Sequence, residues 1–221
     1  MRRGKRVAYF VTLGFNESKA LNAVARAGSE GGDVVLIVRV NPIDAAEKAV
    51  ARVREFAKPL KVSVKVMEVN PKDWVEVIRI AQAMKAYDEV HVIIGGGLRI
   101  PQAFTILAAL DAWDRVRRLE VHDHDTGDEV VIPKWLVPLI ASPERKGKVR
   151  VLLALSAEEP RTRGDIAARV GLSEQTVAKY LSYLVKAGLA KRVMPNKYRL
   201  TPEGERVKTA YASGQAPPKE T

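Results

Sequence analysis

Short runs of β-branched residues alternate with longer amphipathic segments through the first part of the chain, and this alternation constrains the fold more than any other feature. The runs are rich in Val and Ile, as is typical of strands buried on both faces. The predicted strands are Arg6–Thr12, Asp33–Val40, Val62–Val69, Glu89–Ile94 and Arg117–His122. The predicted helices are Ser18–Ala27, Pro42–Ala57, Pro71–Lys85 and Ile100–Ala112. Strict alternation of this kind predicts an α/β Rossmann-like domain, a mainly parallel sheet with helices on both faces.

The alternation stops after this domain. A turn at Thr126-Gly127-Asp128 precedes a short predicted strand, Glu129–Ile132, and prolines at positions 133, 138 and 143 are typical of a connector between domains. The tail is polar and rich in proline, which predicts disorder. The expected organisation is a ligand-sensing and dimerisation domain over 1–132, a linker over 133–144, a DNA-binding domain over 145–211 and a disordered tail over 212–221.

The spacing of apolar residues after the linker predicts a tri-helical core followed by a β-hairpin. Ser173 is an expected N-cap for the third helix, and Gly188 is placed to end that helix. The expected helices surround Val149–Leu155, Thr162–Val170 and Glu174–Ala187, the hairpin pairs Leu189–Met194 with Lys197–Leu200, and Pro202–Tyr211 forms a closing helix. This order is typical of a winged helix-turn-helix domain.

Basic charge is concentrated in the same domain. The chain has a formal net charge of +11, of which residues 145–221 carry +9 and residues 1–144 only +2. A surplus confined to a winged helix-turn-helix indicates double-stranded DNA as the partner. The alternative, a winged helix used only for protein contacts, does not call for such a surplus.

The third helix presents its N-terminal residues to base edges if it enters the major groove. Wing and second-helix cations would instead contact phosphates, which sets affinity and salt dependence. The candidates on the third helix are Ser173, Gln175, Thr176, Lys179 and Tyr180, of which the last two could reach either bases or phosphates. The candidate phosphate contacts are Arg163, Arg192, Lys197 and Arg199.

Two loops follow buried strands of the first domain, at the sheet edge where open α/β sheets bind ligands. They are Thr12-Leu13-Gly14-Phe15-Asn16 and Gly95-Gly96-Gly97-Leu98-Arg99. Glycines let the backbone approach a phosphate, and Arg99 adds a cation suited to an anionic or planar ligand. The alternative is that the three glycines only form a tight turn. Neither loop is a dinucleotide fingerprint or a Walker loop, which argues against nicotinamide binding and ATP hydrolysis.

The motifs TxGF (Thr12–Phe15) and GGxR (Gly96–Arg99) in a Rossmann-like domain, joined to the winged-helix segment RGDIAARVGLSEQTVAKYLSYLVKAGLAKRV, carry a family resemblance. The chain resembles the archaeal CRISPR-associated transcription regulators, whose N-terminal part is the CRISPR-associated Rossmann fold (CARF) domain. The resemblance spans essentially the whole chain.

The resemblance implies a homodimer whose paired loops form one pocket for cyclic oligoadenylate, commonly cyclic tetra-adenylate, a messenger of CRISPR antiviral defence. The implied contacts are the ten residues of the two loops. The expected function is a dimeric, ligand-responsive transcription regulator of CRISPR-associated loci. The alternatives are a ring nuclease that degrades cyclic oligoadenylate, and a regulator that senses a different nucleotide.

Other chemistry has little support in the sequence. The chain has no cysteine and no Ser-His-Asp pattern. His122-Asp123-His124-Asp125 has no third ligand at a motif spacing, so we expect a solvated strand end and no metal. We therefore expect no catalytic residue and no cofactor. No apolar run approaches the ~18 residues of a membrane span, and we expect a cytoplasmic protein.

Overall fold

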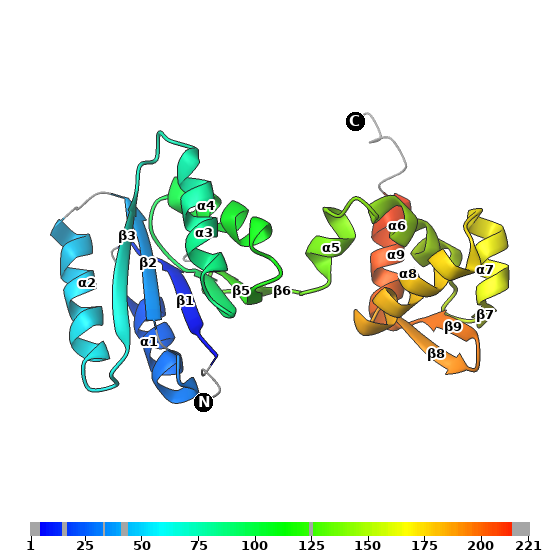
Figure 1. Cartoon of the computed structure of the whole chain (residues 1–221), viewed down its shortest axis with the longest axis horizontal. Helices are drawn as coiled ribbons and strands as arrows, with labels where there is room; N and C mark the ends of the chain where they lie inside the picture. Colours follow the sequence, from blue (N-terminus) through cyan, green and yellow to red (C-terminus); the bar gives the residue numbers. More distant parts are fainter. Residues whose placement is uncertain (1–4, 15–16, 33, 41–43, 124–125, 214–221) are drawn as a thin grey trace. The chain divides into compact units, whose positions relative to one another are not determined.

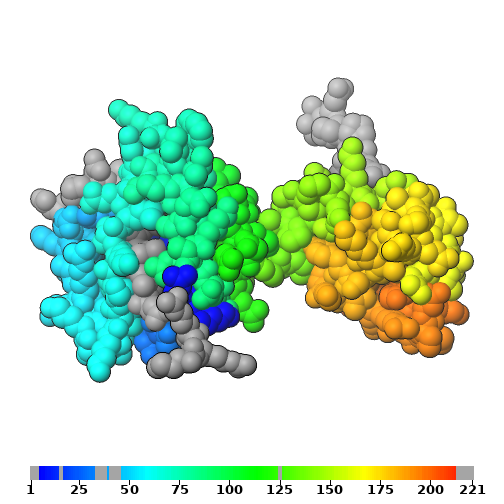
Figure 2. Space-filling model, viewed as in Figure 1, coloured from blue at the N-terminus to red at the C-terminus, as the bar shows by residue number. Residues whose placement is uncertain are grey.

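The structure is a computed structural model that describes residues 5–14, 17–32, 34–40, 44–123 and 126–213. The chain divides into two units, Met1–Pro133 and Lys134–Thr221 (Figure 1). Figure 2 shows each unit in space-filling form as a closely packed body. No helix in the described ranges is both long and apolar enough to cross a bilayer.

The first unit is built on one six-stranded sheet in the order β3-β2-β1-β4-β5-β6. Strands β1 to β5 are parallel, and β6 pairs antiparallel with β5 at one edge. The strands are β1 (Val7–Thr12), β2 (Val34–Val40), β3 (Ser63–Val69), β4 (Glu89–Ile94), β5 (Val116–His122) and β6 (Glu129–Ile132). The predicted Rossmann-like fold is confirmed, because runs of Val and Ile form the central parallel strands.

Helices cover both faces of this sheet (Figure 1). On one face α1 (Ser18–Glu30) packs against β1 and β2, and α2 (Asp44–Ala57) packs against β3. On the other face α4 (Arg99–Asp111) packs against β1, β2 and β4, with α3 (Val75–Lys85) alongside it. Side chains alternate between the two faces of the sheet along β1. Tyr9, Val11 and Leu13 therefore share one face, where they join the core cluster under α1 and α2.

The strand order reverses at β1. The chain runs outward from β1 through β2 to β3, then crosses to β4 on the other side of β1. Thr12, the last residue of β1, is paired in register with Ile94, the last residue of β4. The loops that follow these two strands therefore begin side by side, at the switch point where open α/β sheets bind ligands.

The second unit is a helical bundle with a three-stranded sheet in the order β7-β9-β8. Its strands β8 and β9 form a hairpin whose turn contains Asn196 in the left-handed region, with φ of 60°. The helices are α5 (Leu136–Ile140), α6 (Arg145–Ala154), α7 (Arg163–Val170), α8 (Glu174–Lys186) and α9 (Pro202–Ser213), and the strands are β7 (Arg161–Thr162), β8 (Ala190–Met194) and β9 (Lys197–Leu200). The helices α6 to α8 followed by the hairpin give the predicted winged helix-turn-helix arrangement.

The segment 133–144, which we predicted as a linker, is largely part of the second unit. It contains α5, and Leu139 is fully buried in the second core. The buried Lys148 of α6 donates from Nζ to the carbonyl of Pro138 (3.2 Å) and to Ser142 Oγ (3.0 Å). The prolines suggested a connector, but the apolar residues between them bury against α6. The linker prediction is therefore corrected: the boundary between the two units falls between Pro133 and Lys134.

An aromatic residue of α8 holds the same segment. The Tyr183 hydroxyl donates to the carbonyl of Trp135, and the Lys148 ammonium lies 4.6 Å from the centre of the Tyr183 ring. Burial raises the pKa of Tyr183 to about 12, and the nearby Tyr211 adds to this rise. The hydroxyl therefore stays protonated and able to donate across the physiological pH range.

A capping box begins α7. Thr162 Oγ1 accepts from the Asp165 amide (3.1 Å), and the Asp165 carboxylate accepts from the Thr162 amide (3.1 Å). The hydrogen bond from the Thr162 side chain, followed by the one from its backbone, holds the pKa of Asp165 below its usual value of 3.8. Because the folded-state pKa is lowered, the stabilisation is present above pH 3.8 and is lost as pH falls through the folded-state pKa.

We predict that Thr162→Ala lowers the free energy of unfolding of the second unit by about 1 kcal/mol, since an N-cap is lost. The variant should also lose stability less steeply below pH 4, because Asp165 no longer gains from the hydroxyl. Denaturant unfolding followed by circular dichroism at several pH values measures both effects. The control is Thr209→Ala, whose hydroxyl donates only to the Glu205 carbonyl within α9. If the free energy of unfolding of Thr162→Ala fell below pH 4 as steeply as that of the unaltered protein, this account would be contradicted.

Candidate functional site

The two glycine-containing loops meet at the carboxyl edge of the sheet. Thr12 Oγ1 accepts from the amide of Gly95 (3.2 Å) and, more weakly, from that of Gly96 (3.5 Å). Thr12 is 2% exposed, so its hydroxyl is used inside the protein. The structure gives Thr12 a positioning role, in which it holds the start of the second loop against the first. Leu13 is also buried, in the core beneath α1. Direct ligand contacts from these two side chains remain predictions without support in the structure.

The close approach of the loops requires glycine at two positions. A Cβ atom on Gly14 would lie 2.4 Å from the Gly97 amide nitrogen. Gly97 has φ of 93°, and a Cβ there would lie 2.7 Å from the Leu13 carbonyl oxygen. Any side chain at either position would push the loops apart. Gly14 and Gly97 are therefore needed for the packing of one loop against the other, and the glycines of the second loop do not serve a tight turn alone.

The exposed part of this edge is positively charged. Helix α4 begins at Arg99 without a side-chain cap or an acidic residue in its first turn, so its positive dipole end is uncompensated. Arg99 and Leu98 are exposed beside it. Gln102 Nε2 donates to the Gly97 carbonyl (3.2 Å) and fixes the loop to the helix. Backbone donors and an exposed cation on one edge suit a phosphate-containing ligand.

Lys19 is a candidate that sequence reasoning missed. It lies in the first turn of α1, and a Cβ atom on Gly95 would be 2.6 Å from Lys19 Cγ. The lysine stem therefore runs directly over the second loop, although α1 follows the first. Its place three residues beyond the TxGF loop was a usable signal, but only the pairing of β1 with β4 shows which loop it covers. Phe15 and Asn16, also predicted as contacts, lie outside the described residues.

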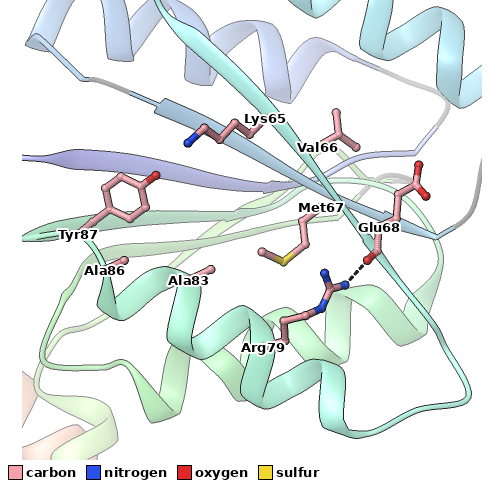
Figure 3. A pocket seen from close by; sticks show the side chains of 8 residues that line it. All are labelled: Lys65, Val66, Met67, Glu68, Arg79, Ala83, Ala86 and Tyr87. Atoms are coloured by element: carbon pink, nitrogen blue, oxygen red, sulfur yellow. Dashed lines mark hydrogen bonds between the residues drawn. The ribbon is translucent and has the colours of Figure 1, made fainter.

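A separate pocket of about 510 Å³ lies between strand β3 and helix α3 (Figure 3). Arg79 reaches across from α3 and donates to the carbonyl of Glu68 in β3. The lining residues are Lys65, Val66, Met67, Glu68, Arg79, Ala83, Ala86 and Tyr87. None of these residues belongs to the two loops, so this pocket is not the predicted ligand site.

The recognition helix α8 places its predicted base contacts in different environments. Ser173 caps the helix by accepting from the Thr176 amide (3.2 Å), and the two hydroxyls lie 2.9 Å apart. Gln175 is exposed, and Lys179 is exposed but paired with Glu144. Tyr180 is half-buried, and a Cβ atom on Gly147 would lie 2.5 Å from its ring. The ring of Tyr180 therefore packs on α6, and its contact with DNA stays a prediction.

The predicted phosphate contacts lie on the wing and at the start of α7. Arg163 Nε donates to the Asn196 side-chain oxygen (2.6 Å) and so joins α7 to the tip of the wing. Arg192 and Lys197 are exposed, whereas Arg199 is half-buried. Within the described part of the chain, no ion pair joins any of these four side chains to a carboxylate. This basic surface is therefore uncompensated, as a phosphate-binding surface requires.

We predict that Thr12→Val lowers the free energy of unfolding of the first unit by about 1–3 kcal/mol, because the loop amides lose their acceptor. Denaturant unfolding measures the change. The matched control is Thr105→Val, a fully buried hydroxyl that donates only to the Pro101 carbonyl one turn back in α4. Equal stability of Thr12→Val and the unaltered protein would remove the hydroxyl from the loop contact.

Two family descriptions match the chain. Residues 7–133 match the Csa3 CRISPR-associated Rossmann-like domain, and residues 139–216 match the HVO_A0261 N-terminal domain. No curated protein matches the chain.

Among solved structures, IdeR of T. acidophilum is 24% identical over 29% of this chain and 32% of its own, with a TM-score of 0.28. Can2 of Sulfobacillus thermosulfidooxidans, in complex with cyclic tetra-adenylate, is 12% identical over 95% of this chain and 67% of its own, with a TM-score of 0.40. The chain thus spans about a third of the length of IdeR and about two thirds of that of Can2. The match over residues 7–133 covers more than half of the 221 residues, and the chain therefore belongs to the family of the Csa3 CRISPR-associated Rossmann-like domain.

Proposed function

We propose that this protein is a ligand-responsive transcription regulator of CRISPR-associated loci. Its first unit binds cyclic oligoadenylate at the edge where Gly14 meets Gly97, and its second unit binds double-stranded DNA. One observation carries the proposal: the two loops meet at the switch point beside an uncapped helix end, with Lys19 and Arg99 close by. Membership of a CRISPR-associated family supports this ligand class over other nucleotides.

The chemistry of the site fits a cyclic oligonucleotide. Each nucleotide of such a ring carries one phosphate, and the site offers backbone donors at the start of α4 together with two cations. The close contact between loops leaves their backbone atoms, rather than side chains, at the surface where Gly97 is exposed. A ligand with several phosphates in a compact ring can make more hydrogen bonds and charge contacts with such a surface than a single nucleotide can.

A second copy of the chain would complete the site. Exposed apolar residues repeat along α4 at helical spacing, at Ile100, Ala103, Leu107 and Leu110. This stripe begins next to Arg99, so a dimer formed through it would bring two copies of the cationic edge together. A two-fold axis between them suits a cyclic ligand with internal symmetry, and cyclic tetra-adenylate is the proposed ring.

The proposed protein binds cyclic oligoadenylate and does not cleave it. Of the described loop residues, which are Thr12–Gly14 and Gly95–Arg99, none carries a carboxylate or an imidazole, and the Thr12 hydroxyl is buried. A ring nuclease would need a group that activates the attacking oxygen. Intact cyclic tetra-adenylate after prolonged incubation supports binding alone, and linear product would overturn this part of the proposal.

Calorimetric titration with cyclic tetra-adenylate tests the ligand site, and we expect one ring per two chains. Arg99→Ala should weaken binding about 10- to 100-fold, because a charged hydrogen bond to phosphate is lost, while DNA affinity without ligand stays unchanged. The matched control is Arg115→Ala, an exposed arginine before β5, at the opposite edge of the sheet. Equal losses in Arg99→Ala and Arg115→Ala would show a general charge effect and contradict the site.

The ion pair between Glu144 and Lys179 leads to a prediction for DNA binding. The hydrogen bond from Lys179 holds the pKa of Glu144 below its usual range, so the pair is present at neutral pH. Glu144→Gln frees Lys179 for phosphate or base, and should raise affinity for duplex DNA by a factor of about two to five. Fluorescence anisotropy at several salt concentrations measures this affinity.

Glu203→Gln is the matched control, since Glu203 pairs with Arg206 on α9, outside the helix-turn-helix. It removes the same charge, so any effect of net charge alone appears in both variants. The double variant Glu144→Gln, Lys179→Ala should lose the gain. A gain that survives the loss of Lys179 would show that Glu144 acts through another group.

A further inference from the structure

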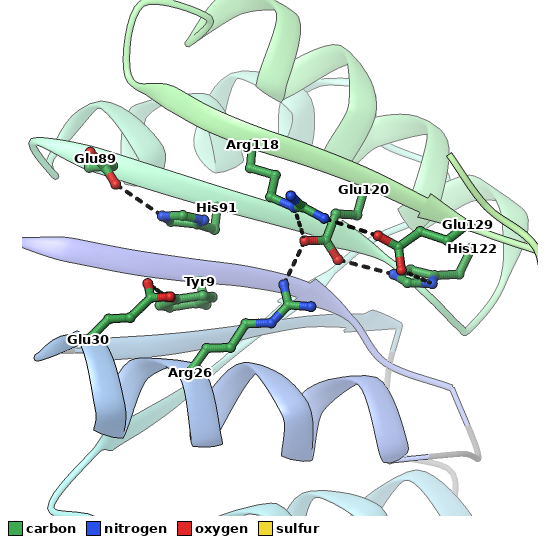
Figure 4. A network of polar contacts seen from close by, with 9 residues as sticks. All are labelled: Tyr9, Arg26, Glu30, Glu89, His91, Arg118, Glu120, His122 and Glu129. Carbon is green, nitrogen blue, oxygen red and sulfur yellow. Dashed lines mark hydrogen bonds and ion pairs between the residues drawn. The ribbon is translucent and has the colours of Figure 1, made fainter. Parts of the chain in front are cut away.

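Three polar side chains, Glu120, His122 and Glu129, lie together on the β5–β6 pair of the first unit (Figure 4). Glu120 and His122 are two residues apart on β5, so they point to the same face of the sheet. His122 is directly paired with Glu129 of the antiparallel strand β6. One ligand atom from each of the three lies within 4.8 Å of the others.

Two arginines orient the carboxylates of this cluster. Glu120 Oε1 accepts from Arg26 of α1 (2.6 Å) and from Arg118. Glu129 Oε1 accepts from Nη2 of the same Arg118 guanidinium (3.1 Å). Each carboxylate thus uses Oε1 for arginine, and Figure 4 shows the second oxygen of each directed toward the imidazole of His122.

His122 lies between these two remaining oxygens. Its Nε2 is 3.3 Å from Glu120 Oε2, and its Nδ1 is 3.7 Å from Glu129 Oε2. The side chain is 5% exposed, and Nδ1 is buried without a hydrogen-bond partner. A buried polar atom without a partner is costly in free energy, and Nδ1 lies beside Glu129 Oε2, where one cation would contact both atoms.

We propose that Glu120, His122 and Glu129 form a binding site for one divalent transition metal, with Zn²⁺ as the preferred ion. Two carboxylate oxygens and one imidazole nitrogen are a donor set for Zn²⁺ or Mn²⁺, whereas Mg²⁺ and Ca²⁺ prefer oxygen alone. The ion takes one imidazole nitrogen, and each ring nitrogen faces a different carboxylate, so the ring of His122 turns to bring Nδ1 and the two oxygens to about 2.0–2.2 Å from the ion. Water fills the open position.

The arginines have two effects on such a site. They fix each carboxylate so that one oxygen stays directed inward, as outer hydrogen-bond donors do around bound metals. They also neutralise part of the negative charge, because Arg26 and Arg118 stand beside the two glutamates. We therefore expect affinity in the micromolar range, below that of structural sites with uncompensated ligands.

The sequence alone argued against a metal here because no third ligand stood at a motif spacing from His122. The missing ligand comes from pairing between strands, which places Glu129 opposite His122 across a turn. A bound ion would join the last two strands of the first unit. It would thereby fix β6, whose last residue, Ile132, lies one residue before the end of the first unit at Pro133.

The test is calorimetric titration of the full chain, stripped with chelator, with Zn²⁺, Co²⁺ and Mg²⁺ in turn. We expect one Zn²⁺ per chain, visible d–d absorption with Co²⁺, and no binding of Mg²⁺. The absence of stoichiometric Zn²⁺ binding would overturn the proposal and leave the cluster as an ion-pair network.

Two variants test the ligands. Glu129→Gln keeps an acceptor for Arg118 at a partly exposed position and should keep the fold, yet weaken Zn²⁺ binding about 10- to 100-fold. His122→Gln should do the same. The matched control is His91→Gln, since His91 on the neighbouring strand is also largely buried but pairs with a single carboxylate, that of Glu89. Equal loss in His91→Gln, or full binding in Glu129→Gln, would contradict the site.

Discussion

The parallel pairing of β1 with β4 is the constraint on which the first unit depends. It brings the ends of two strands that are far apart in the chain into register, Thr12 beside Ile94, and so determines where both loops start. Everything at the proposed ligand site follows from that start. Thr12 can hold the Gly95 amide, Gly14 can touch Gly97, and the lysine after the first loop can cross the second. A shift of one residue in this register would separate all of these contacts.

The second unit depends on a different interaction, the burial of a lysine. Lys148 is 6% exposed, and its ammonium lies against the Pro138 carbonyl, the Ser142 hydroxyl and the face of the Tyr183 ring, with the Glu144 carboxylate 3.8 Å away. A buried ammonium group is tolerated only with such partners. The partners come from the segment before α6 and from the recognition helix α8. One side chain therefore links the entry to the second unit with the helix proposed to read DNA.

Much of the fold was predictable from the sequence, for reasons that are local. Strands buried on both faces are rich in Val and Ile, and a helix such as α8 starts at a side-chain cap, so both leave signals within a few residues. Ser173 was correctly predicted as the cap of α8. The glycine loops were also found, since close approach of two backbones excludes side chains.

What the sequence did not reveal depends on contacts between distant residues. Lys19 covers a loop that lies more than seventy residues away in the chain, and Glu129 faces His122 only because β6 turns back on β5. Tyr180 has the spacing of a groove-facing residue. Its ring also packs on α6, because Gly147 has no side chain and leaves room for it. Helix α5 was not predicted, because the prolines at 133, 138 and 143 indicated an irregular connector. The burial of Leu139 in the second core stabilises the helix in spite of Pro138.

The inclusion of α5 in the second unit changes where that unit starts. The boundary falls between Pro133 and Lys134, and Trp135 already packs against the second core. A fragment meant to fold as the second unit must therefore begin ahead of α5. A fragment that started at Arg145 would lack Leu139 in its core and would deprive the Lys148 ammonium of the Pro138 and Ser142 acceptors.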